Sequence, residues 1–253
     1  MGRPFDHQPV LLESVLKLIA PQPGGVYCDA TIGGGGHAEK LLEASAPDGR
    51  FVGIDRDPEA VEASRRRLAR FGDRVSILHG TFSEIEQLLA AAQVTSLDGL
   101  LVDLGVSSHQ LTTATRGFSF MQLGPLDMRM DQRSGEMAAT LLKKLSEDEL
   151  AQLIFHFGEE RLARPIARSI KRMEAAGALN STRDLYIAVQ RVVGAKRGQS
   201  TDPATRTFQA LRIAVNDELG ELEKLLNILP DPLARGGIGI GIAISGGIGL
   251  ESS

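Results

Sequence analysis

Residues 27–55, YCDATIGGGGHAEKLLEASAPDGRFVGID, decide the fold of this chain. An apolar run ends in a glycine cluster at 33–36, a helical pattern follows, and a second apolar run ends on Asp55. This order predicts a strand, a glycine loop, a helix and a second strand, the unit with which α/β proteins bind adenosine-containing cofactors. Glycines let the backbone approach a ligand where a Cβ would clash, and a carboxylate that ends the second strand can accept hydrogen bonds from ribose hydroxyls.

The glycine loop by itself leaves the cofactor open. Gly33, Gly35 and Ala38 satisfy the dinucleotide pattern G-x-G-x-x-G/A, which suits a NAD-linked oxidoreductase. The same loop suits S-adenosylmethionine (SAM), whose ribose would also meet Asp55 but which has no pyrophosphate. A glycine-rich turn without a ligand is the third alternative, and the spacing to Asp55 argues against it.

Bulk composition bounds the class of protein. The 253 residues fit one large domain or two modest ones, and 42% hydrophobic with 24% charged residues is typical of a soluble globular protein. The single cysteine, Cys28, excludes an internal disulfide and fits a reducing cytoplasm. We expect no membrane segment, because no apolar stretch reaches about 18 residues, and no metal site, because no cluster of cysteine and histidine occurs. The net charge of −4 argues against a non-specific nucleic-acid coat but leaves room for a local basic face.

Apolar runs alternate with helical patterns over the first hundred residues. Strands are expected at about 25–30, 50–55, 75–78 and 98–103. Asp57 followed by Pro58 predicts a helix start, and the spacing of Ser83 and Glu86 predicts a capping box. This alternation predicts a parallel, doubly wound α/β sheet.

The alternation stops after residue 105, and no strand is expected from 106 to 203. Helices are predicted to open at Ser146, at about residue 159 and at Ser181. Apolar residues then step by three and four from 208 to 229, which predicts one long helix over the sheet, followed by a fifth strand after 237. We therefore expect a discontinuous sheet domain, 1–105 plus 204–253, and an inserted helical domain, 106–203.

Several longer segments together resemble one family. They are HQPVLLES, DATIGGGGHAEKLL, GIDRDPEAV, HGTFSEI, GLLVDLGVSSHQL, RGFSF with GPLDMRMD, GEERLARPIARSI and PATRTFQALRIAVNDEL. Between about residues 7 and 229 the chain resembles the bacterial SAM-dependent methyltransferases that modify the N4 amino group of a cytidine in small-subunit (16S) ribosomal RNA. The resemblance implies a Rossmann-type class I methyltransferase sheet with an inserted all-helical domain that recognises the substrate. It also implies SAM as cofactor, the small ribosomal subunit as partner and a cytoplasmic location.

The end of the chain departs from that family. After its fifth strand the family continues with a different segment and further strands, where this chain has AISGGIGLESS and stops. We therefore expect the sheet to be incomplete at its C-terminal side.

The resemblance also implies a set of cofactor-binding residues. Asp55 would bind the ribose diol, Phe82 would sandwich the adenine, and Gln110 would reach the cofactor. For Phe82 a plain core position is the alternative, for Gln110 a surface loop, for the His37 side chain a solvated helix start, and for Asp55 a helix cap at residue 57. The expected cofactor-binding residues are Gly33, Gly35, Gly36, His37, Asp55, Phe82, Asp103 and Gln110.

Asp103 and Ser107 are the expected catalytic residues. The cytosine N4 would attack the SAM methyl group, and its lone pair is delocalised into the ring. An acceptor that holds an N4–H would favour a tetrahedral nitrogen and take up the developing positive charge. Asp103 ends the fourth strand, where such sheets bind ligands. A role of Asp103 towards the cofactor's amino group alone stays open at this point.

RNA binding is expected from the helical domain. Arginines and a lysine recur at helical spacing near residues 161–172, although a solvated face paired with Glu159 and Glu160 is the alternative. The expected RNA-binding residues are Arg129, Arg161, Arg164, Arg168 and Arg206, with Lys171, Arg172, Lys196 and Arg197 adding charge. Only 4% of residues are aromatic, so phosphate contacts should dominate over base stacking. A non-catalytic relative that binds SAM and RNA remains an alternative to the enzyme.

Overall fold

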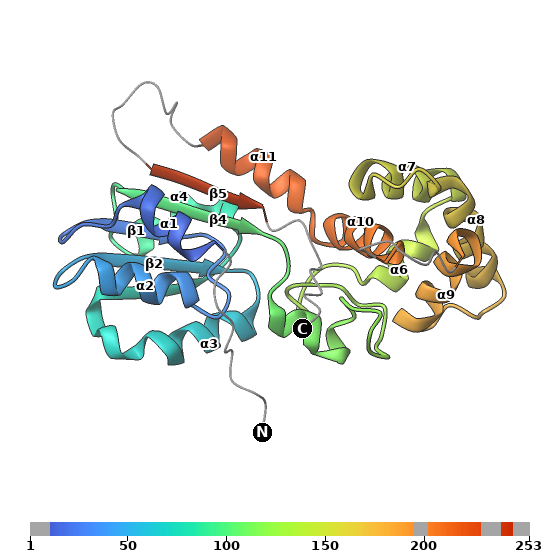
Figure 1. Ribbon diagram of the computed structural model, residues 1–253, viewed down its shortest axis with the longest axis horizontal. Coiled ribbons are helices and arrows are strands. Elements are labelled where there is room, and N and C mark those ends of the chain that lie inside the picture. Colours follow the sequence, from blue (N-terminus) through green and yellow to red (C-terminus); the bar gives the residue numbers. More distant parts are fainter. Residues whose placement is uncertain (1–10, 195–201, 229–238, 245–253) are drawn as a thin grey trace. The chain divides into compact units, whose positions relative to one another are not determined.

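A computed structural model describes residues 11–194, 202–228 and 239–244, and the chain divides into two compact units (Figure 1). The first unit comprises residues 1–107 and 219–246, and the second comprises 108–218 and 247–253. Along the described ranges every helix is too short or too polar to span a bilayer.

The first unit is built on a parallel sheet in the strand order β3-β2-β1-β4-β5. The strands are β1 (Val26–Asp29), β2 (Arg50–Asp55), β3 (Val75–His79), β4 (Gly99–Leu104) and β5 (Gly239–Ile244). The strands expected from the sequence are confirmed, including a fifth that pairs with β4 along its whole length. The remainder of the C-terminal segment, from 245, lies outside the described residues.

Alternate residues of the central strands supply two apolar clusters, one on each face of the sheet. Tyr27, Phe51 and Leu101 belong to the cluster covered by α1 (Leu12–Ile19), α2 (Gly36–Ala44) and α3 (Pro58–Leu68). Their neighbours in the strands, among them Cys28, Val52 and Val102, belong to the cluster covered by α4 (Ile85–Ala91) and α11 (Glu218–Ile228). The carboxyl ends of three buried strands are thereby fixed side by side.

Local helix signals mostly hold in the structure. The Asp57 side chain caps α3 by accepting from the backbone N–H of Glu59. The capping box expected at Ser83 and Glu86 is wrong, because a short 3₁₀ turn at Phe82–Glu84 comes before α4. The box is formed two residues earlier, by Thr81 and Glu84.

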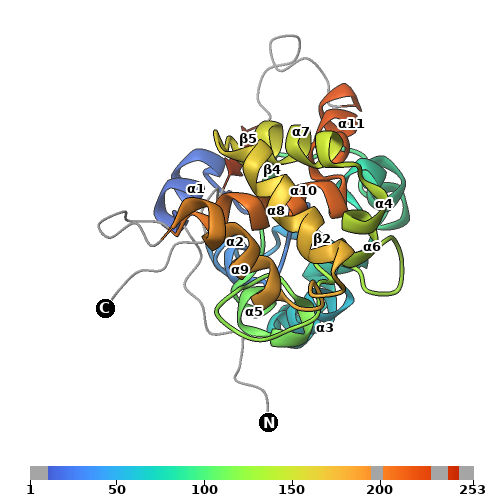
Figure 2. The same ribbon diagram turned by 90° about the vertical axis from the view of Figure 1, so that its right-hand side faces the viewer.

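The second unit is helical, and its described residues contain no strand. Its helices are α5 (Ser108–Thr112), α6 (Ala138–Lys144), α7 (Glu147–Gly158), α8 (Ala163–Ala175), α9 (Thr182–Val193) and α10 (Ala204–Asn216). Helix α7 packs against α8 and α10, and α8 packs against α9 (Figure 2). The predicted helix starts at Ser146 and Ser181 are confirmed, because each side chain accepts from a backbone N–H three residues on.

The expected long helix after residue 204 is broken at Asp217. That residue has a left-handed φ of +49°, so α10 ends at Asn216 and α11 begins at Glu218. Helix α10 lies so close to α7 that a Cβ on Gly158 would stand 2.5 Å from the carbonyl oxygen of Arg206. Residues 204–218 therefore belong with the helical unit, and the structure moves the second boundary from the expected 203/204 to 218/219.

Gly53 gives a test of how β2 supports the glycine loop. A Cβ there would stand 2.1 Å from Cδ1 of Ile32 and 2.9 Å from Cδ1 of Ile77. Gly53→Ala should cost about 1–3 kcal/mol of unfolding free energy, the usual cost of overpacking a core. Adding Ile32→Val, which removes the closer Cδ1, should recover part of that loss in urea unfolding. A Gly53→Ala protein as stable as the wild type would contradict this packing.

Candidate active site

Three aspartates end three neighbouring strands of the sheet. Asp29 closes β1, Asp55 closes β2, and Asp103 is the penultimate residue of β4. Because the order is β2-β1-β4, these carboxylates lie along one edge of the sheet, with Asp29 in the middle. This is the edge at which open parallel sheets bind ligands.

Asp29 and Thr31 form the centre of this edge. The Asp29 side chain is only 2% exposed, and its Oδ1 accepts from the Thr31 backbone N–H at 2.9 Å and from the Thr31 hydroxyl at 3.2 Å. The same hydroxyl accepts from the backbone N–H of Asp103 at 2.7 Å. Sequence reasoning missed both residues, although the signal was present: the acidic Asp29 directly follows an apolar run and precedes the glycines.

Asp55 holds the glycine loop against β2. Its Oδ2 accepts from the backbone N–H of Gly33, and its Oδ1 accepts from that of Asp57, both at 2.8 Å. Gly33 and Gly35 have left-handed φ values of +52° and +77°, which residues with a Cβ rarely adopt. The cap of α3 is Asp57 itself, so Asp55 supports that helix start only through its bond to the Asp57 N–H.

The edge disfavours negative charge. Burial, together with the nearby Asp103 and Asp55 carboxylates, raises the pKa of Asp29 to about 7, against the hydrogen bonds from Thr31. Burial likewise raises the pKa of Asp55 to about 6, against its two backbone hydrogen bonds. A bound cation would relieve both carboxylates, so this edge suits a positively charged ligand.

The other expected cofactor residues fall in different environments. His37, in the first turn of α2, is 9% exposed, so the solvated alternative for its side chain is wrong. Phe82 is 7% exposed and belongs to the apolar cluster with Ile85 and Leu100, which matches the core alternative. Gln110 is 5% exposed within α5 of the helical unit and not in a surface loop.

Residues 105–107 follow β4 directly and are the last residues of this stretch of the sheet unit. Leu104 is buried, whereas Ser107 is half-buried, three residues beyond β4. Asp103 and Ser107 thus follow one another along a single segment that leaves the acidic edge.

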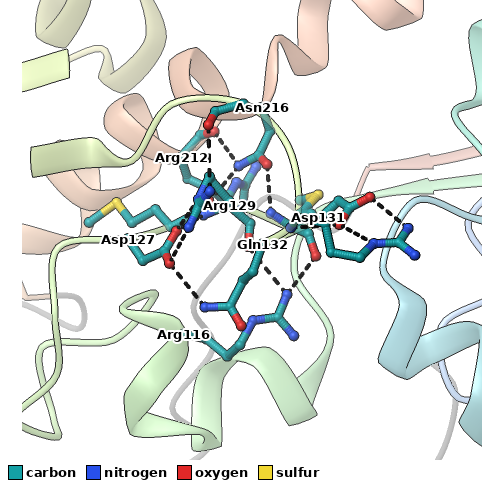
Figure 3. Close-up of polar contacts among 11 residues, drawn as sticks. Arg116, Asp127, Arg129, Asp131, Gln132, Arg212 and Asn216 are labelled. Atoms are coloured by element: carbon teal, nitrogen blue, oxygen red, sulfur yellow. Dashed lines mark hydrogen bonds and ion pairs between the residues drawn. The ribbon is translucent and has the colours of Figure 1, made fainter. Parts of the chain in front are cut away.

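In the helical unit, Asp127 lies at the centre of a polar network (Figure 3). It is 5% exposed and receives Arg129 in a two-pronged ion pair, with Nε 2.7 Å from Oδ1 and Nη2 3.0 Å from Oδ2. Gln132 Nε2 donates to the same Oδ2 at 3.0 Å. Burial raises the pKa of Asp127, but the hydrogen bonds from Arg129 and Gln132 outweigh it and hold that pKa below its usual value. The Arg129 guanidinium is therefore committed to the loop itself.

Two further side chains hold the same loop. Arg116, 1% exposed, donates to the carbonyl oxygens of Arg129 and Met130. Asn216 accepts from the Met130 N–H at 2.8 Å and donates to the Met128 carbonyl at 2.7 Å. These bonds fix a buried segment in which Met128 has a φ of +62° (Figure 3).

The expected helix start at about residue 159 is wrong, because α8 begins at Ala163, so Arg161 of the basic stripe lies before the helix. The stripe is only partly available to a ligand. Arg161 and Arg164 are exposed, whereas Arg168 pairs with Glu147 on α7 at 3.0 Å. Lys171 donates to the Leu142 carbonyl at the end of α6 and pairs with Glu174. Arg206, on α10, donates to the Glu159 backbone carbonyl at 3.3 Å and lies 3.9 Å from a Glu160 carboxylate oxygen. The ion pairs of Arg168 and Lys171 in the stripe are with Glu147 and Glu174, not with Glu159 or Glu160. Lys196 and Arg197 lie outside the described residues.

Two proteins similar to this chain carry the same name. Ribosomal RNA small subunit methyltransferase H from Sorangium cellulosum is 54% identical over 233 residues, which are 92% of this chain and 73% of that protein. The protein of the same name from Geobacter sulfurreducens is 49% identical over 242 residues, or 94% of this chain and 77% of that protein. A solved RNA methyltransferase from Salinibacter ruber is 21% identical, covers 51% of this chain and 83% of its own, and superposes with a TM-score of 0.31, too low to support a conclusion.

The parallel sheet, the glycine loop and the acidic carboxyl edge define a Rossmann-type α/β protein with a helical insertion. Within that class the chain can be assigned to one family. The MraW methylase family matches residues 4–244, and the chain belongs to it.

The raised pKa values predict how the stability of the ligand-free protein depends on pH. A carboxyl whose folded pKa lies above its unfolded pKa binds more protons when folded, so it stabilises at low pH and loses that contribution as pH rises through the folded value. Because of Asp29 and Asp55, the melting temperature should therefore fall as the pH rises from about 4 to about 7. Asp29→Asn should reduce the difference in melting temperature between pH 5 and pH 8. An unchanged difference would show that the pKa of Asp29 is not raised in the folded protein.

Proposed function

We propose that this protein transfers a methyl group from SAM to the N4 amino group of a cytidine in small-subunit (16S) ribosomal RNA. The observation that carries the proposal is the acidic edge of the sheet, where Asp29, Asp55 and Asp103 adjoin a glycine loop. Membership of a methylase family and the name shared by the similar proteins support the same reaction. The chemistry at N4 follows from the sequence resemblance, and the ribosomal substrate favours a cytoplasmic location.

The residues present fit SAM, because that cofactor carries an ammonium group and a sulfonium, together with a ribose diol. Asp29 and Asp55, whose pKa values are raised, would be stabilised in their charged forms by a cationic ligand, and a neutral ligand would give no such gain. When bound, SAM supplies an electrophilic methyl group on a good leaving group. Binding and orientation of both reactants then fall to the chain.

Asp55 joins the cofactor site to the loop that shapes it. Each of its oxygens already accepts one backbone N–H, and each keeps acceptor capacity for a ribose hydroxyl. Gly33, Gly35, Gly36 and the start of α2 at His37 would lie against the cofactor through backbone groups. Phe82 and Gln110 complete the proposed set, Phe82 as an apolar wall from its core position.

Asp103 is the proposed acceptor for the N4–H of the cytidine. The Thr31 hydroxyl fixes its backbone N–H, so the position of Asp103 at the end of β4 is set before substrate binds. An acceptor held there would favour a tetrahedral N4 and take up positive charge as the bond to the methyl group forms. Ser107, farther along the same segment, would supply a second polar contact.

Asp103→Asn should separate this role from cofactor binding. We expect methylation to fall by at least about a hundredfold, the low end of the loss when one preorganised contact to transition-state charge is removed. SAM affinity, measured by calorimetry, should change much less. If turnover falls only in proportion to SAM affinity, Asp103 serves the cofactor alone, which is the other role considered for it.

The proposed RNA-binding residues of the helical unit are Arg161, Arg164, Arg168 and Arg206. Arg161 and Arg164 are exposed, and Arg168 and Arg206 have neighbours that a phosphate could replace. Arg129 already forms an ion pair with Asp127, which favours a structural role for Arg129 in shaping the loop over direct contact with RNA. Phosphate contacts of this kind position RNA without reading its sequence.

Neutralising the stripe gives a quantitative test. The triple variant Arg161→Gln, Arg164→Gln, Arg168→Gln should weaken binding to small ribosomal subunits. It should also lower the slope of log affinity against log salt by up to about three, roughly one per phosphate contact. Arg66→Gln with Arg70→Gln serves as control, because these side chains are 70% and 56% exposed in the sheet unit. An unchanged slope in the triple variant would show that the stripe is a solvated surface that does not contact RNA.

A direct test uses ribosomal RNA from cells with and without the gene. Mass spectrometry should find one N4-methylated cytidine that disappears without the gene and returns with the wild-type protein. The alternative, a relative that binds SAM and RNA without catalysis, predicts SAM binding and no change in the RNA.

A further inference from the structure

Residues 121–123 form the exposed tip of a loop in the helical unit. Met121 is 64% exposed and Leu123 is 73% exposed, and Gln122 between them is also exposed. Single exposed apolar residues are common on proteins. Two of them on a three-residue tip are informative if the tip is held rigidly, because a rigid surface loses little conformational entropy on binding.

The chain before the tip is anchored by aromatic packing. Phe120 is 6% exposed; its ring stacks on Tyr186 at 5.1 Å and meets Phe208 edge-on at 5.2 Å. The Met121 backbone N–H donates to the Ser119 hydroxyl, which closes the turn into the tip. The side chain of Met121 therefore leaves the loop at a fixed point.

The chain after the tip is anchored to the start of α9. The Thr182 N–H donates to the Gly124 carbonyl at 2.9 Å, and the Thr182 hydroxyl binds both the Gln122 carbonyl and the Gly124 N–H. A Cβ on Gly124 would stand 1.9 Å from the Ala114 carbonyl oxygen, so the backbone is also packed tightly from below. Three backbone groups of a loop with two apolar side chains are thus paired to one threonine.

A positive charge lies at the base of this tip. Arg183 follows Thr182, is exposed, and has its guanidinium carbon 5.1 Å from the Tyr186 ring centroid, the ring on which Phe120 stacks. Nearby carboxylates are engaged elsewhere. Asp184 accepts from the Asn180 N–H and the Ser181 hydroxyl, and Asp202 accepts from Tyr186 and Gln190. Among the described residues no carboxylate lies within ion-pair distance of Arg183.

We propose that Met121 and Leu123 pack against an unstacked base of the small-subunit RNA while Arg183 contacts a phosphate of the same strand. This rests on the proposed function and specifies a part of the substrate surface that the arginine stripe of α8 does not include. Sequence-specific contacts to RNA fall on single-stranded segments whose bases are unstacked. Met and Leu are among the apolar side chains that proteins place against the faces of bases when they insert between base steps of DNA. A rigid apolar tip with a cation at its base offers an apolar contact for the base of an unpaired nucleotide and a positive charge for its phosphate.

The two halves of this contact respond differently to salt. Met121→Ser with Leu123→Ser removes apolar contact alone, so affinity for small subunits should fall about tenfold while the salt slope stays unchanged. Arg183→Gln removes one phosphate contact, so the slope should fall by about one. Leu18→Ser is the matched control, because Leu18 is 70% exposed on α1 of the sheet unit and should leave both quantities unchanged. Wild-type affinity in the double serine variant would overturn the proposal.

Photo-crosslinking distinguishes RNA from a ribosomal protein at the tip. Photo-methionine at position 121, irradiated with small subunits from cells lacking the gene, should give a product that nuclease removes. Crosslinks to ribosomal protein alone would overturn the proposal. A wild-type protein that takes up SAM in calorimetry but binds no subunit would overturn the proposed function and the tip with it. Wild-type binding combined with unaffected tip variants would overturn the tip alone.

Discussion

The buried carboxylate of Asp29 imposes the constraint around which the sheet unit is arranged. Removing a carboxylate from water is costly unless donors or a cation compensate, and here Thr31 donates both its backbone N–H and its hydroxyl. The same hydroxyl fixes the Asp103 N–H, so the end of β4 depends on the residue that stabilises the end of β1. Asp55 adds a second link, because it holds the glycine loop that begins beyond Thr31. A sheet edge that is unfavourable for anions when empty is thereby preorganised for a cationic ligand.

The helical unit meets a different requirement, the burial of irregular backbone. Residues 127–130 form no helix or strand, yet Asp127, Met128 and Met130 are buried, and each buried polar backbone group needs a partner. Arg116 and Asn216 provide partners from two different elements. Two cations that the sequence suggests for RNA are therefore used for structure: Arg129 inside the loop, and Lys171 at the end of α6.

Local signals were enough to predict most of the fold. Apolar runs located the strands, and serine and aspartate caps located three helix starts, because these preferences depend on neighbouring residues only. The break at Asp217 was missed because the apolar spacing of three and four continues through it, and periodicity does not report a change of helix direction. Asp55 was found at its strand end, whereas the link from Thr31 to Asp103 joins residues 72 apart and follows only from the order of the strands. Arg129 is held by Asp127, two residues away, and is therefore not available to bind RNA phosphate. Counting the charged residues in the sequence does not show this pairing.

The distribution of charge also bears on how RNA is recognised. The chain has a net charge of −4 and few aromatic residues, and several of its basic side chains already have partners within the helical unit. Few phosphate contacts give a shallow dependence on salt and a weak attraction to free RNA. Affinity must then come from a surface whose shape is fixed in advance, since ordering either partner during binding would cost conformational entropy. In the proposed complex, a loop pinned by Thr182 and Phe120 would lower that cost on the protein side, and a folded ribosomal subunit would lower it on the RNA side. Rigid surfaces on both partners would then compensate for the small number of phosphate contacts.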